Sequence, residues 1–249
     1  MLCSVGIKKT TPIKKWRKMI NLEKTNPNMT ARLTGFMYLL LVPLGVFGIL
    51  FVPSRIIVPE SMGETVNNIL ANESLFRLSI VSALLAYLVN LIVVLLLYKL
   101  LSPVNKYVAQ LMVLFVVLAI PIAMLNELTS GAVLLLANSA EQPHDLIALF
   151  LDLHEYGVHI AGIFWGLWLF PMGFLVFKSN YIPKIIGIAL MIGCFGYFVD
   201  AFIFILFPEF GIAFAEFLFI GEVLLPVWLL IKGVNVERWQ QQALTLEVA

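Results

Sequence analysis

The 249-residue chain is 61% hydrophobic and 12% charged, with a net charge of +1 and a mean hydropathy of +0.98. Soluble globular proteins are roughly 45–50% apolar and about 25% charged, so this composition predicts a polytopic membrane protein without a separate soluble domain. The near-neutral charge does not suggest a nucleic-acid partner. The two cysteines, Cys3 and Cys194, fall in the N-terminal segment and inside an apolar stretch, which excludes a disulfide framework.

Residues 1–29 are basic and lack the apolar core and small-residue cleavage site of a signal peptide. We expect them to form a cytoplasmic tail. The lysines and arginine around Trp16 could contact an anionic membrane surface, because each basic residue there contributes about 1 kcal/mol. Alternatively, the tail only orients the first helix, or translation begins at Met19 or Met29.

The apolar segments that follow are each long enough to cross a hydrocarbon layer of about 30 Å, which takes roughly 20 residues. In chain order they are Ala31–Val52, Leu75–Leu97, Val108–Leu128, Gly157–Phe177, Ile185–Phe207 and Ile212–Ile231. All of the 16 lysines and arginines except Arg55 and Arg77 fall on the side of the N-terminus, the second-to-third and fourth-to-fifth links and the C-terminus. By the positive-inside rule that side is cytoplasmic. We therefore predict an all-α bundle of six transmembrane helices with both termini in the cytoplasm.

The third and fourth segments are unusually long. Their apolar pattern continues through Thr129–Asn138 and again through Asp145–Tyr156, so two continuous helices would each exceed about 40 Å. We expect either a helical hairpin that projects beyond the outer leaflet or a break near Ser130-Gly131. The predicted organisation is then a tail over residues 1–29, a membrane domain over 30–233 and a cytoplasmic C-terminal tail over 234–249.

Four stretches of this chain resemble a known family. They are TARLTGFMYLLL (Thr30–Leu41), PSRIIVP (Pro53–Pro59), TVNNILANESLFRL (Thr65–Leu78) and IFWGLWLFPMGFLVFKSNYIPKIIG (Ile163–Gly187). Together they resemble the bacterial membrane proteins catalogued as domain of unknown function 4386, over about Thr30 to Gly233. The resemblance implies six helices in a bacterial cytoplasmic membrane, and it implies no activity or cofactor.

Polar side chains of the predicted helices gather near one level, at or just inside the outer boundary of the hydrocarbon, when a rise of about 1.5 Å per residue is counted from the cytoplasmic ends. The candidate residues of this polar layer and of the positions beside it are Arg77, Asn126, Glu127, Asp152, Glu155, His159, Asp200, Glu216 and Glu222. Glu222 is nearest to mid-membrane, where an ionised side chain costs at least about 2.5–3.5 kcal/mol, so we expect it to be protonated or paired.

The polar layer has two main interpretations. It could be a structural plug in which Arg77 pairs with Glu127, Asp200 or Glu216 and locks the register of the helices. It could instead form an outward-facing acidic pocket that binds or passes a small solute, a cation or a lipid, because acidic residues outnumber basic ones there. We take the pocket, without catalysis, as the leading functional hypothesis.

Two further hypotheses remain open. Glu155 and His159 lie four residues apart on one helix face and could hold a metal for an intramembrane, hydrolase-like enzyme, although the histidines of HEYGVH are spaced differently from those of the zinc-protease motif HExxH. The chain could also be a scaffold or partner subunit, or form a homo-oligomer through glycine-rich faces such as Gly162–Gly166. The lipid bilayer is the one partner that the composition itself predicts.

Overall fold

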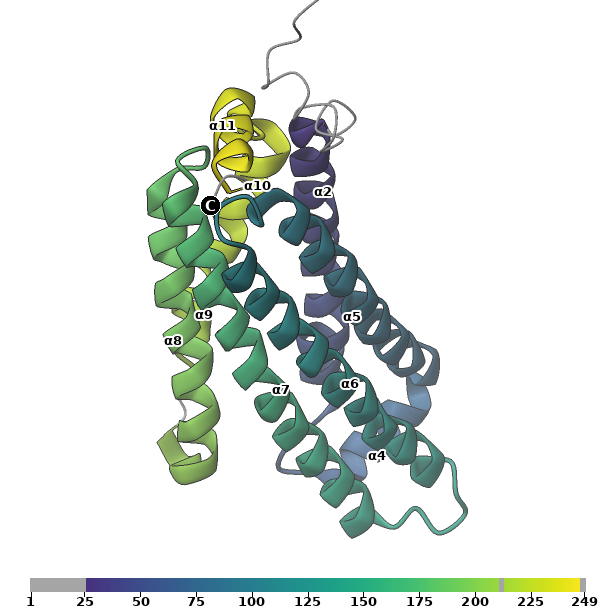
Figure 1. Ribbon diagram of the computed structural model, residues 1–249. Coiled ribbons are helices and arrows are strands. Elements are labelled where there is room, and N and C mark those ends of the chain that lie inside the picture. The colour runs from purple at the N-terminus through teal and green to yellow at the C-terminus, as the bar shows by residue number, and fades with distance from the viewer. Residues whose placement is uncertain (1–25, 211–212, 247–249) are drawn as a thin grey trace, which may run out of the picture.

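A computed structural model describes residues 26–210 and 213–246, apart from the side chains of residues 208, 216 and 246 (Figure 1). Every regular element of this described part is helical, which confirms the all-α prediction. The elements are α2 (Pro27–Gly45), η2 (Val46–Phe51), α3 (Val52–Ile56), α4 (Met62–Ala71), α5 (Glu73–Leu101), α6 (Lys106–Ala137), α7 (His144–Ser179), α8 (Lys184–Leu206), η3 (Pro208–Phe210), α9 (Ala215–Leu218), α10 (Ile220–Ile231) and α11 (Val236–Leu246).

Five stretches of helix are long and apolar enough to cross a membrane. They are the continuous stretch Pro27–Ile56, which runs from α2 through the π-helical η2 into α3, and the helices α5, α6, α7 and α8. The sixth predicted span differs, since α10 has 12 residues and is separated from α9 at Phe219. The preceding helix α9 begins where the Asp200 carboxylate accepts the backbone N–H groups of Phe214 and Ala215, at 2.7 Å each.

The long helices and α10 close into a ring. Each packs against two neighbours, in the order α2, α5, α6, α7, α8, α10 and back to α2. Both ends of the described chain lie at one end of this ring, where α2 begins and α10 gives way to α11 (Figure 1). There the Asn28 side chain accepts the backbone N–H of Val234 at 2.8 Å. The shorter α10 packs between α8 and α2 and is therefore the sixth member of the ring.

The α6–α7 hairpin projects and does not break at Ser130-Gly131. These helices have 32 and 36 residues, which corresponds to lengths of about 48 and 54 Å against a hydrocarbon layer of about 30 Å. Their far ends share a second apolar cluster with α3, α4 and the start of α5, which buries Val133, Ala137 and Ile147 beside Ile69. The projecting end of the hairpin therefore has its own hydrophobic support (Figure 1).

The end of the chain packs onto the opposite end of the bundle. Of the stretch expected as a C-terminal tail, residues 236–246 form α11, and its Trp239 is 5% exposed. The Trp239 indole and the Tyr181 hydroxyl both donate hydrogen bonds to the carbonyl of Leu100, at 2.9 and 2.8 Å. This carbonyl belongs to the last turn of α5 and has no partner within its own helix, so the two side chains satisfy it. Residues 1–25 of the expected N-terminal tail lie outside the described residues.

Candidate functional site

Arg77 lies apart from the buried carboxyls. Its guanidinium pairs with Glu73, one turn earlier on α5, at 2.6 Å, and its side chain is 59% exposed. The predicted pairing of Arg77 with Glu127 or Asp200 is therefore wrong, and a pairing with Glu216 falls on a side chain outside the described residues. The reason is geometric, because Glu73 occupies the neighbouring position on the same exposed helix face.

A second group of candidates lies between α7 and α8. The His159 ring stacks on Phe204, with ring centroids 3.9 Å apart, and it interacts electrostatically with Glu155 and Asp200. Asp200 already accepts two backbone N–H groups and so fixes the start of α9. Glu155 and Asp152 are exposed. This group gives the N-terminal half of α7 an acidic, exposed face.

A third group joins α6 to α7 through His154. The Asn126 amide donates to the His154 carbonyl at 2.8 Å, and the hydroxyls of Thr129 and Ser130 lie 2.9 and 3.1 Å from His154 Nδ1. A Cβ on Gly157 would overlap the Asn126 side chain, so only glycine fits there without displacing it. These contacts hold the two long helices in register, and Asn126 is engaged in them.

Glu127 turns into the bundle, where its residue surface is 7% exposed. The Tyr87 hydroxyl of α5 donates to Glu127 Oε1 at 3.2 Å, and Ser130 is a further hydroxyl beside the carboxyl. Side chains tilt towards the N-terminus of their helix, and α5 and α6 run in opposite directions. Tyr87 and Glu127 therefore approach each other although their backbones lie at different depths.

Glu222 lies on the opposite side of the ring, at the start of α10. The Tyr38 hydroxyl of α2 donates to Glu222 Oε2 at 3.4 Å, and Tyr197 of α8 also interacts with this carboxyl. Its other oxygen, Oε1, is buried and has no hydrogen-bond partner among the described residues. Glu222 is about 14 Å from the end of α10, near the middle of the hydrocarbon layer.

Two tryptophans of α7 connect these tyrosine–glutamate pairs. The Tyr87 ring packs on Trp165 with centroids 6.2 Å apart, and the Tyr38 ring packs on Trp168 at 5.9 Å. Every helix of the ring thus contributes to one group of interior side chains, which we call the central belt. Its members are Tyr38 (α2), Tyr87 (α5), Glu127 (α6), Trp165 and Trp168 (α7), Tyr197 (α8) and Glu222 (α10).

The central belt contains two carboxyl groups, and no positive charge balances them within the described part of the chain. Within the described part of the chain, neither Glu127 nor Glu222 has a cationic side chain at ion-pair distance. An ionised carboxyl in such surroundings costs several kcal/mol unless a proton or a cation accompanies it. Among the described residues, no group of three or more His, Cys, Asp and Glu could hold a metal ion, so Glu155 and His159 are not joined by a third ligand.

The sequence pointed to the carboxyls of the central belt and missed its tyrosines. Tyr38, Tyr87 and Tyr197 fall in the middle of predicted spans, whereas membrane tyrosines usually gather at the interfaces. That unusual depth was the available signal. The side chain of Glu216 lies outside the described residues, so its candidate role remains a prediction.

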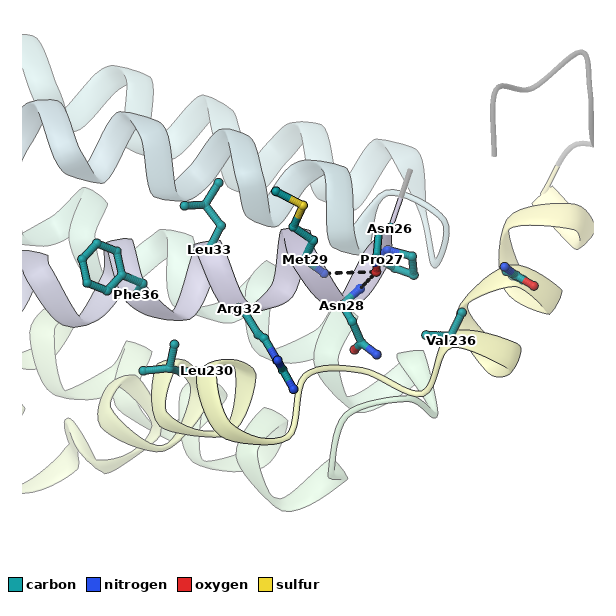
Figure 2. A pocket seen from close by; sticks show the side chains of 10 residues that line it. Asn26, Pro27, Asn28, Met29, Arg32, Leu33, Phe36, Leu230 and Val236 are labelled. Atoms are coloured by element: carbon teal, nitrogen blue, oxygen red, sulfur yellow. Dashed lines mark hydrogen bonds between the residues drawn. The ribbon is translucent and has the colours of Figure 1, made fainter. Parts of the chain in front are cut away.

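Two cavities lie away from the central belt. One, of about 570 Å³, is mainly apolar and is lined by Arg77 and by residues of α5 and α6 that include Leu128 and Gly131. The other, of about 1040 Å³, opens where α2 begins, against α10 and α11 (Figure 2). Of the predicted site residues, Arg77 alone lines either of these two cavities.

Comparison with known proteins places most of the chain in one family. The family described as "Domain of unknown function (DUF4386)" matches residues 33–233. An "Uncharacterized protein" of Archaeoglobus fulgidus is 34% identical over 155 residues, which cover 62% of this chain and 83% of the relative. No solved structure matches the chain. The matched range covers the ring of helices except the first residues of α2, and it agrees with the resemblance found in the sequence.

Proposed function

We propose a function on the premise that the chain belongs to the DUF4386 family, whose description names no activity. The chain is an integral membrane protein, and its central belt takes up and releases a proton or a small monovalent cation. This exchange accompanies the binding or passage of a small solute. The observation that carries the proposal is Glu222, a carboxyl near mid-membrane with two phenols beside it and one buried oxygen that has no partner among the described residues.

Buried polar atoms are nearly always hydrogen-bonded in folded proteins, so an unpartnered one needs a chemical reason. A proton or small cation at Glu222 would provide one, because it neutralises the carboxyl and needs little space. Ionisable groups inside membrane helices are rare and commonly lie on proton or ion pathways. Glu127, with its own tyrosine, offers a second position of the same chemistry nearer the outer end.

The exposed acidic face of α7 supports entry from the outer side. Asp152 and Glu155 lie there beside Asp200 and His159, and a concentration of negative charge attracts cations. We place the protein in the cytoplasmic membrane of a prokaryote with both termini inside. The distribution of lysine and arginine supports this orientation. The archaeal relative supports a prokaryotic membrane.

The test is proton flux in liposomes that contain the purified protein and a pH-sensitive dye, under imposed gradients of Na⁺ or K⁺. Wild-type protein should change the internal pH in response to at least one of these gradients. Glu222→Gln keeps the shape of the side chain and cannot ionise, so it should abolish the response. Glu237→Gln, on the exposed face of α11, is the matched control and should behave as wild type. An equal response in wild type and Glu222→Gln, or no response in the wild type, contradicts the proposal.

A further inference from the structure

The cavity of about 1040 Å³ at the start of α2 is a formed feature of the fold (Figure 2). The Asn28 side chain accepts the Val234 N–H at 2.8 Å and so holds the turn between α10 and α11 against α2. Gly233 within that turn has φ +69, and a Cβ there would overlap Asn28 Oδ1 and displace it. The walls of the cavity are therefore fixed by contacts between helices.

The polar side chains that line this cavity lie at its mouth. Asn26, Asn28 and Gln240 are there, together with the apolar Pro27, Met29 and Val236. The lining nearer the membrane centre is apolar throughout and consists of Leu33, Phe36 and Leu230. Arg32 lies between the two and reaches from α2 towards the turn that follows α10 (Figure 2). This order of polar, cationic and apolar groups matches that of an anionic amphiphile entering a bilayer.

The depth of Arg32 agrees with such a ligand. The stretch Pro27–Ile56 has 30 residues, or about 45 Å, close to the thickness of a bilayer with its headgroups. Arg32 is five residues into that stretch, so its Cα lies about 8 Å from the end. With the hydrocarbon layer of about 30 Å centred on the stretch, that position is the edge of the hydrocarbon, from which the long arginine side chain can reach the lipid phosphates just beyond.

The charges around the cavity favour an anion. Arg32 is exposed and, within the described part of the chain, forms no ion pair. None of the described residues that line the cavity is acidic. Lys232 follows α10 at the same end of the bundle and is exposed. An arginine of this kind can bind a phosphate through two parallel hydrogen bonds.

We propose that this cavity binds an anionic phospholipid from the leaflet on the N-terminal side. Arg32 binds the lipid phosphate, and an acyl chain lies over Leu33, Phe36 and Leu230. This lipid site is independent of cation exchange at the central belt, because it lies at the end of the bundle and shares none of the belt residues.

The test is native mass spectrometry of the full chain released from nanodiscs made with equal amounts of phosphatidylglycerol and phosphatidylcholine. Wild-type protein should retain about fivefold or more phosphatidylglycerol than phosphatidylcholine. Arg32→Gln should lose that preference, whereas Arg32→Lys should keep part of it because it keeps the charge. Arg55→Gln is the matched control, since Arg55 is exposed at the opposite end of the same helical stretch.

Thermal unfolding of each variant should show that all of them fold. A preference that is equal in wild type and Arg32→Gln would overturn the proposal. So would an equal loss in Arg32→Gln and Arg55→Gln, because the preference would then depend on overall charge. If Arg32→Gln fails to fold, Leu230→Trp, which narrows the apolar part of the cavity, provides the test through reduced lipid retention.

Discussion

The Tyr38 hydroxyl lies 3.4 Å from Glu222 Oε2, across 184 residues of sequence. This contact joins the first described helix of the ring to the last one and places a phenol against a carboxyl near mid-membrane. Because the Tyr38 ring also packs on Trp168, the contact lies inside the core of the bundle and away from its lipid-facing surface. Closure of the ring and the chemistry of the central belt therefore depend on the same pair.

Replacing Tyr38 with phenylalanine removes one interhelical hydrogen bond and leaves the ring packing intact. Such bonds contribute about 0.6–1.5 kcal/mol, so we expect Tyr38→Phe to lower the free energy of unfolding by that amount. Thermal or denaturant unfolding in detergent would measure the change. Tyr107→Phe is the control, since Tyr107 is 82% exposed and should tolerate the change. Equal stability of Tyr38→Phe and wild type would mean that the contact does not stabilise the closed ring.

The glycines of α7 should differ sharply in their tolerance of alanine. A Cβ on Gly173 would lie 2.6 Å from the carbonyl oxygen of Gly187 on α8, whereas a Cβ on Gly162 meets no atom within 4 Å. We expect Gly173→Ala to destabilise the protein by about 1–3 kcal/mol through overpacking. Gly162→Ala should stabilise it by about 0.5–1 kcal/mol, because alanine favours the helix. Unfolding of the two variants side by side measures both; equal effects would contradict close packing at Gly173.

Hydropathy and charge were sufficient to predict the class of fold and the first five spans, because a bilayer imposes length and apolarity on each helix. The same rules cannot place contacts between distant helices. The prediction that Arg77 pairs with a buried carboxyl failed because it used only the depth of each residue along its helix. It did not include the direction in which each side chain points. A neighbour four residues away, Glu73, was the simpler partner.

The sixth span shows the same limit. Composition predicted a helix over Ile212–Ile231, yet Asp200, from another helix, fixes a start near Ala215, and Gly221 packs on the backbone of α8 near Leu190. Tertiary contacts of this kind set helix boundaries and leave no local pattern in the sequence. The carboxyls of the central belt were visible as costly residues, whereas their tyrosine partners became apparent only when the ring was closed.

Asp200 should act as a cap for α9. Removing its carboxylate in Asp200→Ala leaves the N–H groups of Phe214 and Ala215 without their acceptors, which costs about 1–3 kcal/mol locally. We expect hydrogen exchange of the amides of residues 214 and 215 to accelerate by at least about fivefold. Asp152→Ala, an exposed acidic position, should leave these rates unchanged. Unchanged exchange in Asp200→Ala would show that the cap does not hold this segment.

Neutralising Arg77 should have little effect on stability. The Arg77–Glu73 pair is exposed and lies within one helix, and such pairs contribute about 0.3–0.5 kcal/mol. Breaking a buried pair would cost about 3–5 kcal/mol instead. The free energy of unfolding of Arg77→Gln therefore distinguishes the observed surface pair from a structural plug. A loss of several kcal/mol would show that Arg77 has a buried partner after all.

Tyr181 and Trp239 should be coupled through the one carbonyl that both of them bind. In Tyr181→Phe or Trp239→Phe, the Leu100 oxygen keeps one donor, so each change should cost about 1–2 kcal/mol. In the double variant this buried oxygen has neither donor, and the loss should exceed the sum of the single losses by about 0.5–3 kcal/mol. A double-mutant cycle of unfolding free energies measures the excess. Additivity within about 0.3 kcal/mol would mean that water replaces the donors and that the Leu100 carbonyl does not couple Tyr181 to Trp239.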